Sequence, residues 1–325
     1  MKLFLLALFT GIGSFLSFGQ DRPQNGVAPS FPDAYILKNA TIIVSPQKTI
    51  SNGYILVEKG KVKDIGNILL KPTHAVEIDC KGKTIVPAFI DLNTDLGMQK
   101  QQPAERRERT PQIDAKKENF FSWNDAVRPE FLSAENYKTN EAENEKLAKA
   151  GFGFALTHLN DGIVRGTGSV ISLGSHPVLS SLFAANVSTH FSLEKGSSRQ
   201  TYPSSQMGSI ALLRQALYDV KWYQKHADNA TINLSLEALA KQLEKPIFFS
   251  TSEALEILRG AKIATEFHLK FSFYGSGNEY QHIDAIKKTG ATIIIPAHFP
   301  DAYNVSDPYI NMEIPLKELK HWELA

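Results

Sequence analysis

The sequence predicts an α/β protein in which a small β domain precedes a larger unit of alternating strands and helices. Two observations lead to this prediction. Short runs rich in β-branched residues, separated by glycine, proline and asparagine, fill residues 34–84 at the spacing of an antiparallel meander. Beyond residue 133, apolar strand-like runs alternate with stretches of helical periodicity, which is typical of a parallel sheet covered by helices.

The bulk composition is that of a globular protein. The chain has 325 residues, of which 42% are hydrophobic and 21% are charged, so it can bury a large core. Its net charge is +1, from 35 basic and 34 acidic residues, and no global field draws it toward nucleic acid or anionic lipid. We therefore expect a small molecule as ligand, and neither nucleic acid nor a membrane as partner of the mature protein.

The N-terminus predicts export. Residues 1–20 place one lysine before an apolar run that ends in small residues, which is the pattern of a cleaved secretory signal peptide. A retained membrane anchor is the weaker alternative, because the run is short and contains Gly11 and Gly13. We expect a periplasmic protein whose residues 21–33 form a disordered leader. Cys80 is the only cysteine, which excludes an internal disulfide and favours a small buried hydrophobe.

The elements follow in order along the chain. Apolar runs at 34–46, 53–67 and 74–87 predict strands of one small sheet. The charged stretch 98–120 lacks hydrophobic periodicity and predicts a surface loop, of the kind that often overhangs a binding site. Helices are expected at 134–151, 205–227, 234–244, 253–268 and 279–290, and strands at 85–97, 152–159, 168–175, 181–193, 246–252, 269–275 and 291–298.

The stretch "TIVPAFIDLNTDLG" at 84–97 carries a family resemblance. A meander that leads into this strand resembles the amidohydrolase superfamily, in particular its exported, imidazolonepropionase-like branch. In that family a small β-sandwich precedes a (β/α)8 barrel whose first strand reads Pro-Gly-Phe-Ile-Asp-x-His-x-His. Pro87, Phe89, Ile90 and Asp91 match the pattern, with Ala88 at the glycine. The resemblance covers residues 34–325.

This resemblance implies a fold of α/β class, an incomplete TIM-type (β/α)8 metal-dependent-hydrolase barrel preceded by a small β-sandwich. Residues 34–84 would be the N-terminal part of the sandwich, a composite domain, and residues 85–325 the barrel. Counting strands from Ile85 reaches only a seventh before Ala325, so the barrel would lack its last strand. We therefore expect the chain to be a fragment of a longer protein.

The metal-binding positions of the family are substituted here. Residues i and i+2 of a strand project to the same side, so the two histidines of the motif converge on one ion at the barrel mouth. Their places hold Asn93 and Asp95, and an asparagine carbonyl is a poor zinc ligand. The family's later histidines end the fifth and sixth strands. The matching stretches hold Ser250 and Thr251, then Tyr274 and Gly275.

A rebuilt site is the alternative. His158 and His298 follow apolar strands and precede Asp161 and Asp301, and His190 lies in a third strand. These imidazoles could converge on one metal ion, although hydrogen-bonded structural histidines are the commoner outcome.

Three functions remain open at this point. The resemblance implies a metal-dependent hydrolase of non-peptide carbon–nitrogen bonds, with zinc or another divalent metal as the cofactor of intact members. The substituted ligands favour instead a catalytically silent module that supports or dimerises with an active amidohydrolase module downstream in the same protein. The third function is a periplasmic protein that binds a small ligand at the barrel mouth without turnover, with the charged loop 98–120 as a lid.

Overall fold

The computed structural model describes residues 32–68, 75–99, 112–117, 120–174, 181–226, 231–277 and 279–296. The chain divides into two compact units, Met1–Pro87 and Ala88–Ala325. The predicted signal peptide, most of the leader, most of the charged loop and His298 lie outside the described residues.

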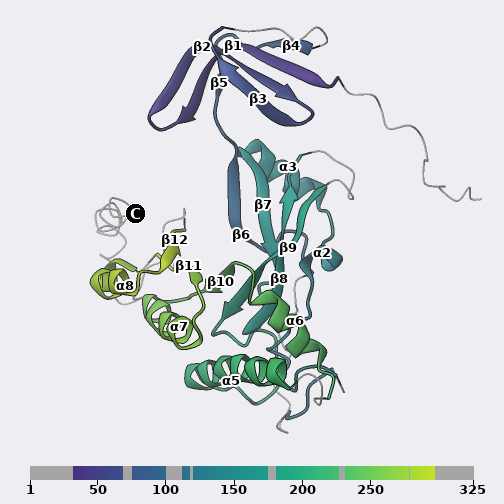
Figure 1. Cartoon of the computed structure of the whole chain (residues 1–325), viewed down its shortest axis with the longest axis vertical. Helices are drawn as coiled ribbons and strands as arrows, with labels where there is room; N and C mark the ends of the chain where they lie inside the picture. Colours follow the sequence, from purple (N-terminus) through teal and green to yellow (C-terminus); the bar gives the residue numbers. More distant parts are fainter. Residues whose placement is uncertain are drawn as a thin grey trace, which may run out of the picture. The chain divides into compact units, whose positions relative to one another are not determined.

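The first unit contains one sheet in its described part (Figure 1). Strands β1 (Ala34–Ser45), β2 (Lys48–Glu58) and β3 (Lys61–Gly66) form the predicted antiparallel meander, while β4 (Ala75–Asp79) and β5 (Thr84–Ile85) run parallel to β1. The register of β1 shifts between Leu37 and Ala40, around Asn39, whose φ is 62°. Cys80 is buried in the apolar cluster beyond this shift. The completion of this sheet to a sandwich stays a prediction.

The second unit is built on a seven-stranded sheet in the order β12-β11-β10-β9-β8-β7-β6. Its described strands are β6 (Phe89–Thr94), β7 (Phe152–His158), β8 (Val164–Ser172), β9 (Leu182–Ser192), β10 (Ile247–Ser250), β11 (Phe271–Tyr274) and β12 (Thr292–Ile294).

All these strands run parallel except β8, which is antiparallel to both of its neighbours. The connection 159–163 between β7 and β8 is too short for a parallel crossover, so the chain must turn back on itself. Because β6 and β12 stand at opposite ends of this strand order, they do not pair with each other. The expectation that the barrel lacks its last strand stays a prediction.

The helices match the expected positions except over 134–151, where one predicted helix is two, because the backbone turns extended at Tyr137 and Asn140 caps a new helix. They are α2 (Ser133–Asn136), α3 (Glu141–Lys149), α5 (Gln206–Lys225), α6 (Leu234–Gln242), α7 (Ala254–Phe267), the 3-10 turn η2 (Glu279–His282) and α8 (Ile283–Thr289). Ser205 caps α5 and Asn233 caps α6, since their side chains accept from Gly208 N and Leu236 N. None of the helices among the described residues has the length and apolar character needed to cross a membrane.

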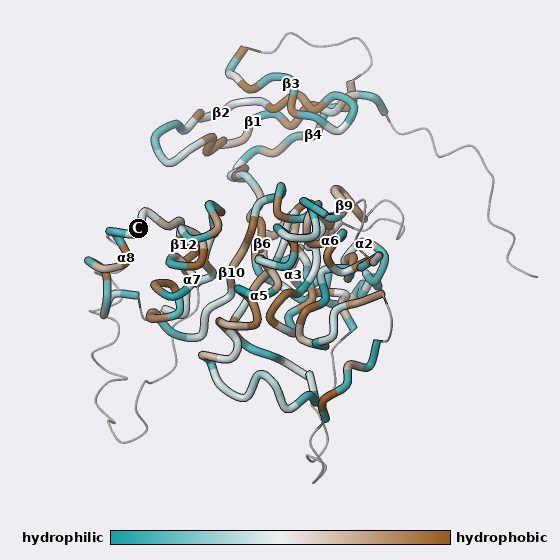
Figure 2. The backbone as a smooth tube through the Cα atoms, turned by 60° about the horizontal axis from the view of Figure 1, so that its bottom comes forward, coloured by the Kyte–Doolittle hydropathy of each residue, from teal (hydrophilic) through white to brown (hydrophobic). Residues whose placement is uncertain are grey.

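One apolar core joins α5, α6 and α7 to β9, β10 and β11. Leu213 and Leu217 of α5 are fully buried in it, as are Phe249 and Phe273 of the strands. Each such side chain contributes about 1.5–3 kcal/mol through its removal from water. Figure 2 shows hydrophobic segments inside this unit, among its strands and helices. The core thereby fixes the strands whose carboxyl ends lie together at one edge of the sheet.

Candidate functional site at the carboxyl edge of the sheet

Four flat side chains from four strands stack at this edge. His158 ends β7, His190 lies near the end of β9, and Phe248 and Tyr274 belong to β10 and β11. The ring centroids of His158 and His190 are 3.8 Å apart at an interplanar angle of 14°. Phe248 lies 5.4 Å from His190 and 5.3 Å from Tyr274, in nearly parallel planes. We call these four residues the ring stack.

The two histidines of the ring stack are buried and neutral. Both are 0% exposed. Burial lowers the pKa of His158 to about 3, and the positive charge of Arg165 acts in the same direction. Burial also places the pKa of His190 well below its usual range, with further lowering by His158 and Arg165. Neither imidazole carries a charge at neutral pH.

The ring nitrogens of the ring stack are turned toward the protein. Nε2 of His158 lies 3.0 Å from Oδ1 of Asn93, and its Nδ1 lies 3.2 Å from the Leu159 carbonyl oxygen. Nε2 of His190 lies 2.8 Å from Oγ of Ser188. Nδ1 of His190 is buried and has no hydrogen-bond partner among the described residues. The sheet thus brings three predicted site residues together, Asn93, His158 and His190.

This arrangement does not fit a zinc ion. A ligating imidazole directs an in-plane lone pair at a metal about 2.0–2.1 Å away. Because the rings of His158 and His190 stack face to face, their lone pairs run in parallel planes and do not meet at one point. Asn93 faces His158, while Asp95 lies half-buried just beyond β6. Within the described part of the chain, no group of three or more His, Cys, Asp or Glu side chains is placed to hold a metal ion.

The ends of β10 and β11 are tied to neighbouring elements. Ser250 Oγ accepts a hydrogen bond from Arg165 Nη1 at 2.8 Å, and Thr251 Oγ1 donates to the Tyr274 carbonyl at 2.6 Å. Tyr274 Oη donates to the carbonyl oxygen of Leu92 in β6 at 2.5 Å. Burial raises the pKa of Tyr274, and the negative charge of Asp91 raises it further, so the phenol keeps its proton. The hydrogen bonds of these side chains join β10 to β8, the end of β10 to β11, and β11 to β6.

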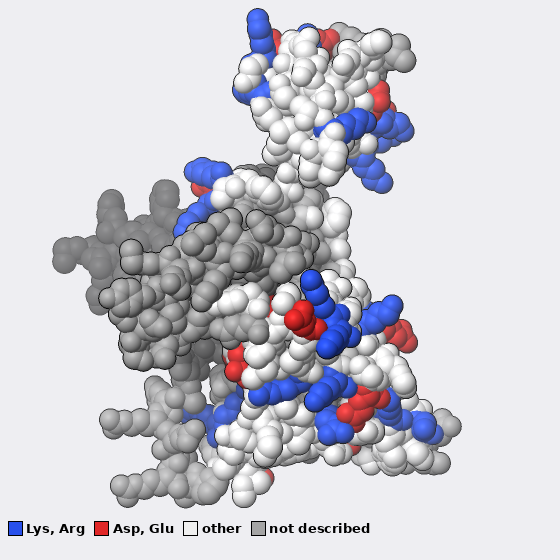
Figure 3. Space-filling model, turned by 90° about the vertical axis from the view of Figure 1, so that its left-hand side faces the viewer, with Lys and Arg blue, Asp and Glu red and all other residues white. Residues whose placement is uncertain are grey.

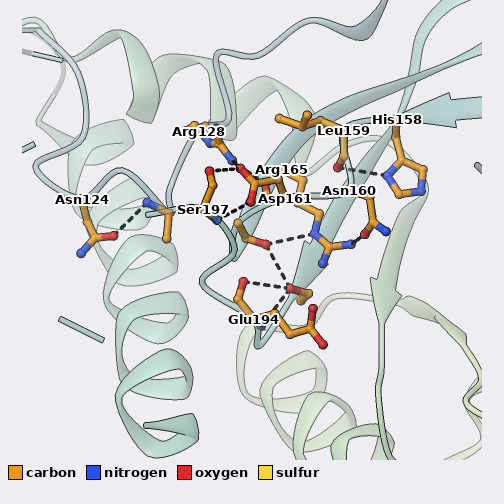
Figure 4. Close-up of polar contacts among 12 residues, drawn as sticks. Asn124, Arg128, His158, Leu159, Asn160, Asp161, Arg165, Glu194 and Ser197 are labelled. Carbon is orange, nitrogen blue, oxygen red and sulfur yellow. Dashed lines mark hydrogen bonds and ion pairs between the residues drawn. The ribbon is translucent and has the colours of Figure 1, made fainter. Parts of the chain in front are cut away.

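Arg165 is a buried cation that sequence reasoning missed. It is 2% exposed, and burial lowers its pKa to about 10. Its guanidinium donates to the Gly162 carbonyl, to Asn160 and to Ser250, and it forms no ion pair with a described residue. Figure 4 shows Arg165 between Asn160 and the loop that carries Glu194. A charge so placed opposes protonation of both stacked histidines.

A second polar cluster surrounds Asp161, just after β7 (Figure 4). Arg128 forms an ion pair with its carboxylate, and Ser197 donates to it from both its backbone nitrogen, at 2.5 Å, and its hydroxyl, at 2.7 Å. Burial raises the pKa of Asp161, but the hydrogen bonds from Ser197 and the charge of Arg128 outweigh it and lower the pKa overall. Gly196 has φ +64°, and a Cβ there would lie 1.9 Å from Asp161 Oδ1. Asp161 therefore links the turn after β7 to the two loops that carry Arg128 and Ser197. We call these three residues the Asp161 clamp.

Among solved structures, the chain is similar to an amidohydrolase from Thermotoga maritima, with 20% sequence identity and a TM-score of 0.67 over 88% of this chain and 76% of that chain. A β-aspartyl dipeptidase from Fervidobacterium islandicum matches at 14% identity and a TM-score of 0.37, over 89% of this chain and 71% of its own. A D-hydantoinase from Thermus sp. matches at 13% and 0.37, over 80% and 57%. No family model and no curated protein matches.

The likeness to the Thermotoga protein shows the fold. It confirms the predicted mixed α/β fold, which this chain shares with the Thermotoga amidohydrolase. The exported branch, the missing strand and the sandwich stay predictions. The roles of His158 and His190 could be drawn from sequence only as two alternatives, because their stacking depends on the antiparallel β8, which pairs with both of their strands.

Proposed function

We propose that this chain provides an exported, catalytically silent module with an amidohydrolase fold. The observation that carries the proposal is the ring stack: of the three histidines predicted for a rebuilt metal site, His158 and His190 face each other instead, and both Nε2 atoms have protein partners. The fold's hydrolases of carbon–nitrogen bonds use a bound metal to supply hydroxide, and the residues present here do not hold one in that geometry.

A module without catalysis can support an active module by binding it through its surface and by staying folded beside it. The ring stack links β7, β9, β10 and β11, the Tyr274 hydrogen bond links β11 to β6, and the Asp161 clamp links loops, at the edge where a working barrel would keep an open cavity. Such an edge, held by contacts within the protein, suits a supporting role for an active amidohydrolase module of the same protein. Figure 3 supports a partner without strong charge, since basic and acidic side chains are interspersed on the face that it draws.

Binding of a small ligand without turnover is the second candidate function. A cavity of about 150 Å³ favours it, because its lining belongs to the segments that follow β6 and β9, and both segments contact Asp161 just beyond the carboxyl end of β7. The C-terminal face of barrel sheets is where ligands are usually held.

Turnover tests the first proposal. The purified chain is incubated with Zn²⁺ or Mn²⁺ and assayed with a hydantoin and with a β-aspartyl dipeptide, the substrate types named for the more distant neighbours. We expect hydrolysis no faster than in buffer with the same metal. Metal-dependent turnover that is lost in His158→Gln and kept in His226→Gln, a change at an exposed histidine of another surface, would overturn it.

A further inference from the structure

The cavity beside the Asp161 clamp is lined by two buried polar groups that the contacts of the clamp leave without hydrogen-bond partners. It measures about 150 Å³. Its walls come from Lys116, Lys117 and residues 122–130, which precede α2, and from Ser197 and Ser198, which follow β9. Figure 4 shows Arg128 and Ser197 reaching Asp161 from these two segments. The clamp therefore holds together the two walls of the cavity.

Two of the three cationic side chains in the lining are in ion pairs, Arg128 with Asp161 and Lys117 with Glu130. Three cationic side chains, Lys116, Lys117 and Arg128, line the cavity together with two carboxylates, Asp125 and Glu130. Both carboxylates already accept hydrogen bonds from the protein. The backbone nitrogen of Lys116 donates to Asp125 at 2.9 Å. Lys117 Nζ at 2.7 Å and the hydroxyl of Ser235 at 2.8 Å donate to the two oxygens of Glu130.

Two hydrogen-bond donors of the lining are still unpaired. Nε of Arg128 and Oγ of Ser198 are buried and have no hydrogen-bond partner among the described residues, and both residues line the cavity. Ser198 is 8% exposed, so its hydroxyl has little access to bulk water. Buried polar groups in folded proteins are nearly always paired, and an orphan donor calls for an acceptor. Lys116 adds an exposed ammonium group at the rim.

We propose that this cavity binds the oxyanion group of a small molecule, a carboxylate or a phosphate. An oxyanion supplies several acceptor atoms, which matches the unpaired donors of Arg128 and Ser198, and the ammonium group of Lys116 lines the same cavity. The proposal deepens the second candidate function, ligand binding without turnover, and it is independent of whether the ring stack is catalytically silent.

Titration of the whole chain with inorganic phosphate and with acetate tests the site. Binding is followed by calorimetry at a constant ionic strength of about 0.15 M, held with chloride so that general screening is the same in every titration. Two variants remove donors, Ser198→Ala at the orphan hydroxyl and Lys116→Gln at the exposed rim. Lys262→Gln, at an exposed lysine of α7, is the matched control.

We expect saturable binding of at least one of the two anions. Each donor variant should weaken it by about tenfold, the usual effect of losing one hydrogen bond to a charged group, and the control should leave it unchanged. The anion that binds more tightly identifies the ligand class. The absence of saturable binding, or equal binding by wild type and both donor variants, overturns the site. Neither outcome depends on the turnover assay, so the two proposals fail separately.

Discussion

Acid should destabilise the second unit through the ring stack. The folded-state pKa of His158 is about 3, against an ordinary value of 6.5. A histidine with a lowered pKa binds protons only after unfolding, so its contribution to stability is complete above about pH 6.5 and is lost as the pH falls toward about 3. Between about pH 7 and pH 5 the free energy of unfolding should fall by about 2 kcal/mol from His158 alone. The pKa of His190 is lowered in the same direction, so this residue adds to the loss of stability.

Urea unfolding followed by tryptophan fluorescence measures this loss. All three tryptophans follow Pro87 in the sequence, so the signal reports on the second unit. His190→Phe keeps a flat ring beside Phe248 but cannot titrate, and we expect it to reduce the pH dependence. His226→Gln, which alters an exposed histidine, should leave it as in the wild type. Equal stability at pH 7 and pH 5, or a pH dependence that only His226→Gln removes, would refute the assignment of buried neutral histidines.

Two substitutions, each with a control, test the Asp161 clamp and the ring stack. Gly196→Ala should cost about 3 kcal/mol or more of unfolding free energy, because the new Cβ would lie 1.9 Å from a carboxylate oxygen at φ +64°. Gly290→Ala, at φ +65° with nothing within 4 Å, should cost only about 1 kcal/mol in the same melt, and equal costs would argue against the clamp. Tyr274→Phe should cost about 1–3 kcal/mol by leaving the Leu92 carbonyl unpaired. Tyr218→Phe, at an exposed hydroxyl, should cost less than Tyr274→Phe, and a reversed order would show that Tyr274 does not join the strands.

Sequence reasoning predicted the second unit in some detail. Helical periodicity placed α5, α6 and α7, and short apolar runs placed β10, β11 and β12 as a parallel set, because local pattern and burial agree in these elements. The direction of β8 was not predicted. A turn of five residues was hidden between two strand-like runs, and only the pairing partners settle which way the second run points.

The site was predictable only in part. Asn93, His158 and His190 could be named as strand-end residues, and the structure brings them together. Their relation could not be derived, since a shared strand end is equally compatible with chelation and with stacking. Arg165 and Ser198 gave no signal in the sequence. An arginine in a glycine-rich strand and a serine in a loop acquire meaning only from burial and from missing partners, and both are properties of the folded chain.

Metal content tests the central claim most directly. The chain is purified after expression in medium supplemented with zinc, passed over a desalting column, and analysed for bound metals alongside His158→Asn and His226→Gln. Because the lone pairs of the two stacked imidazoles do not converge, we expect far less than one metal ion per chain, with no difference among the three proteins. One tightly bound ion per chain, retained in His226→Gln and lost in His158→Asn, would contradict the account.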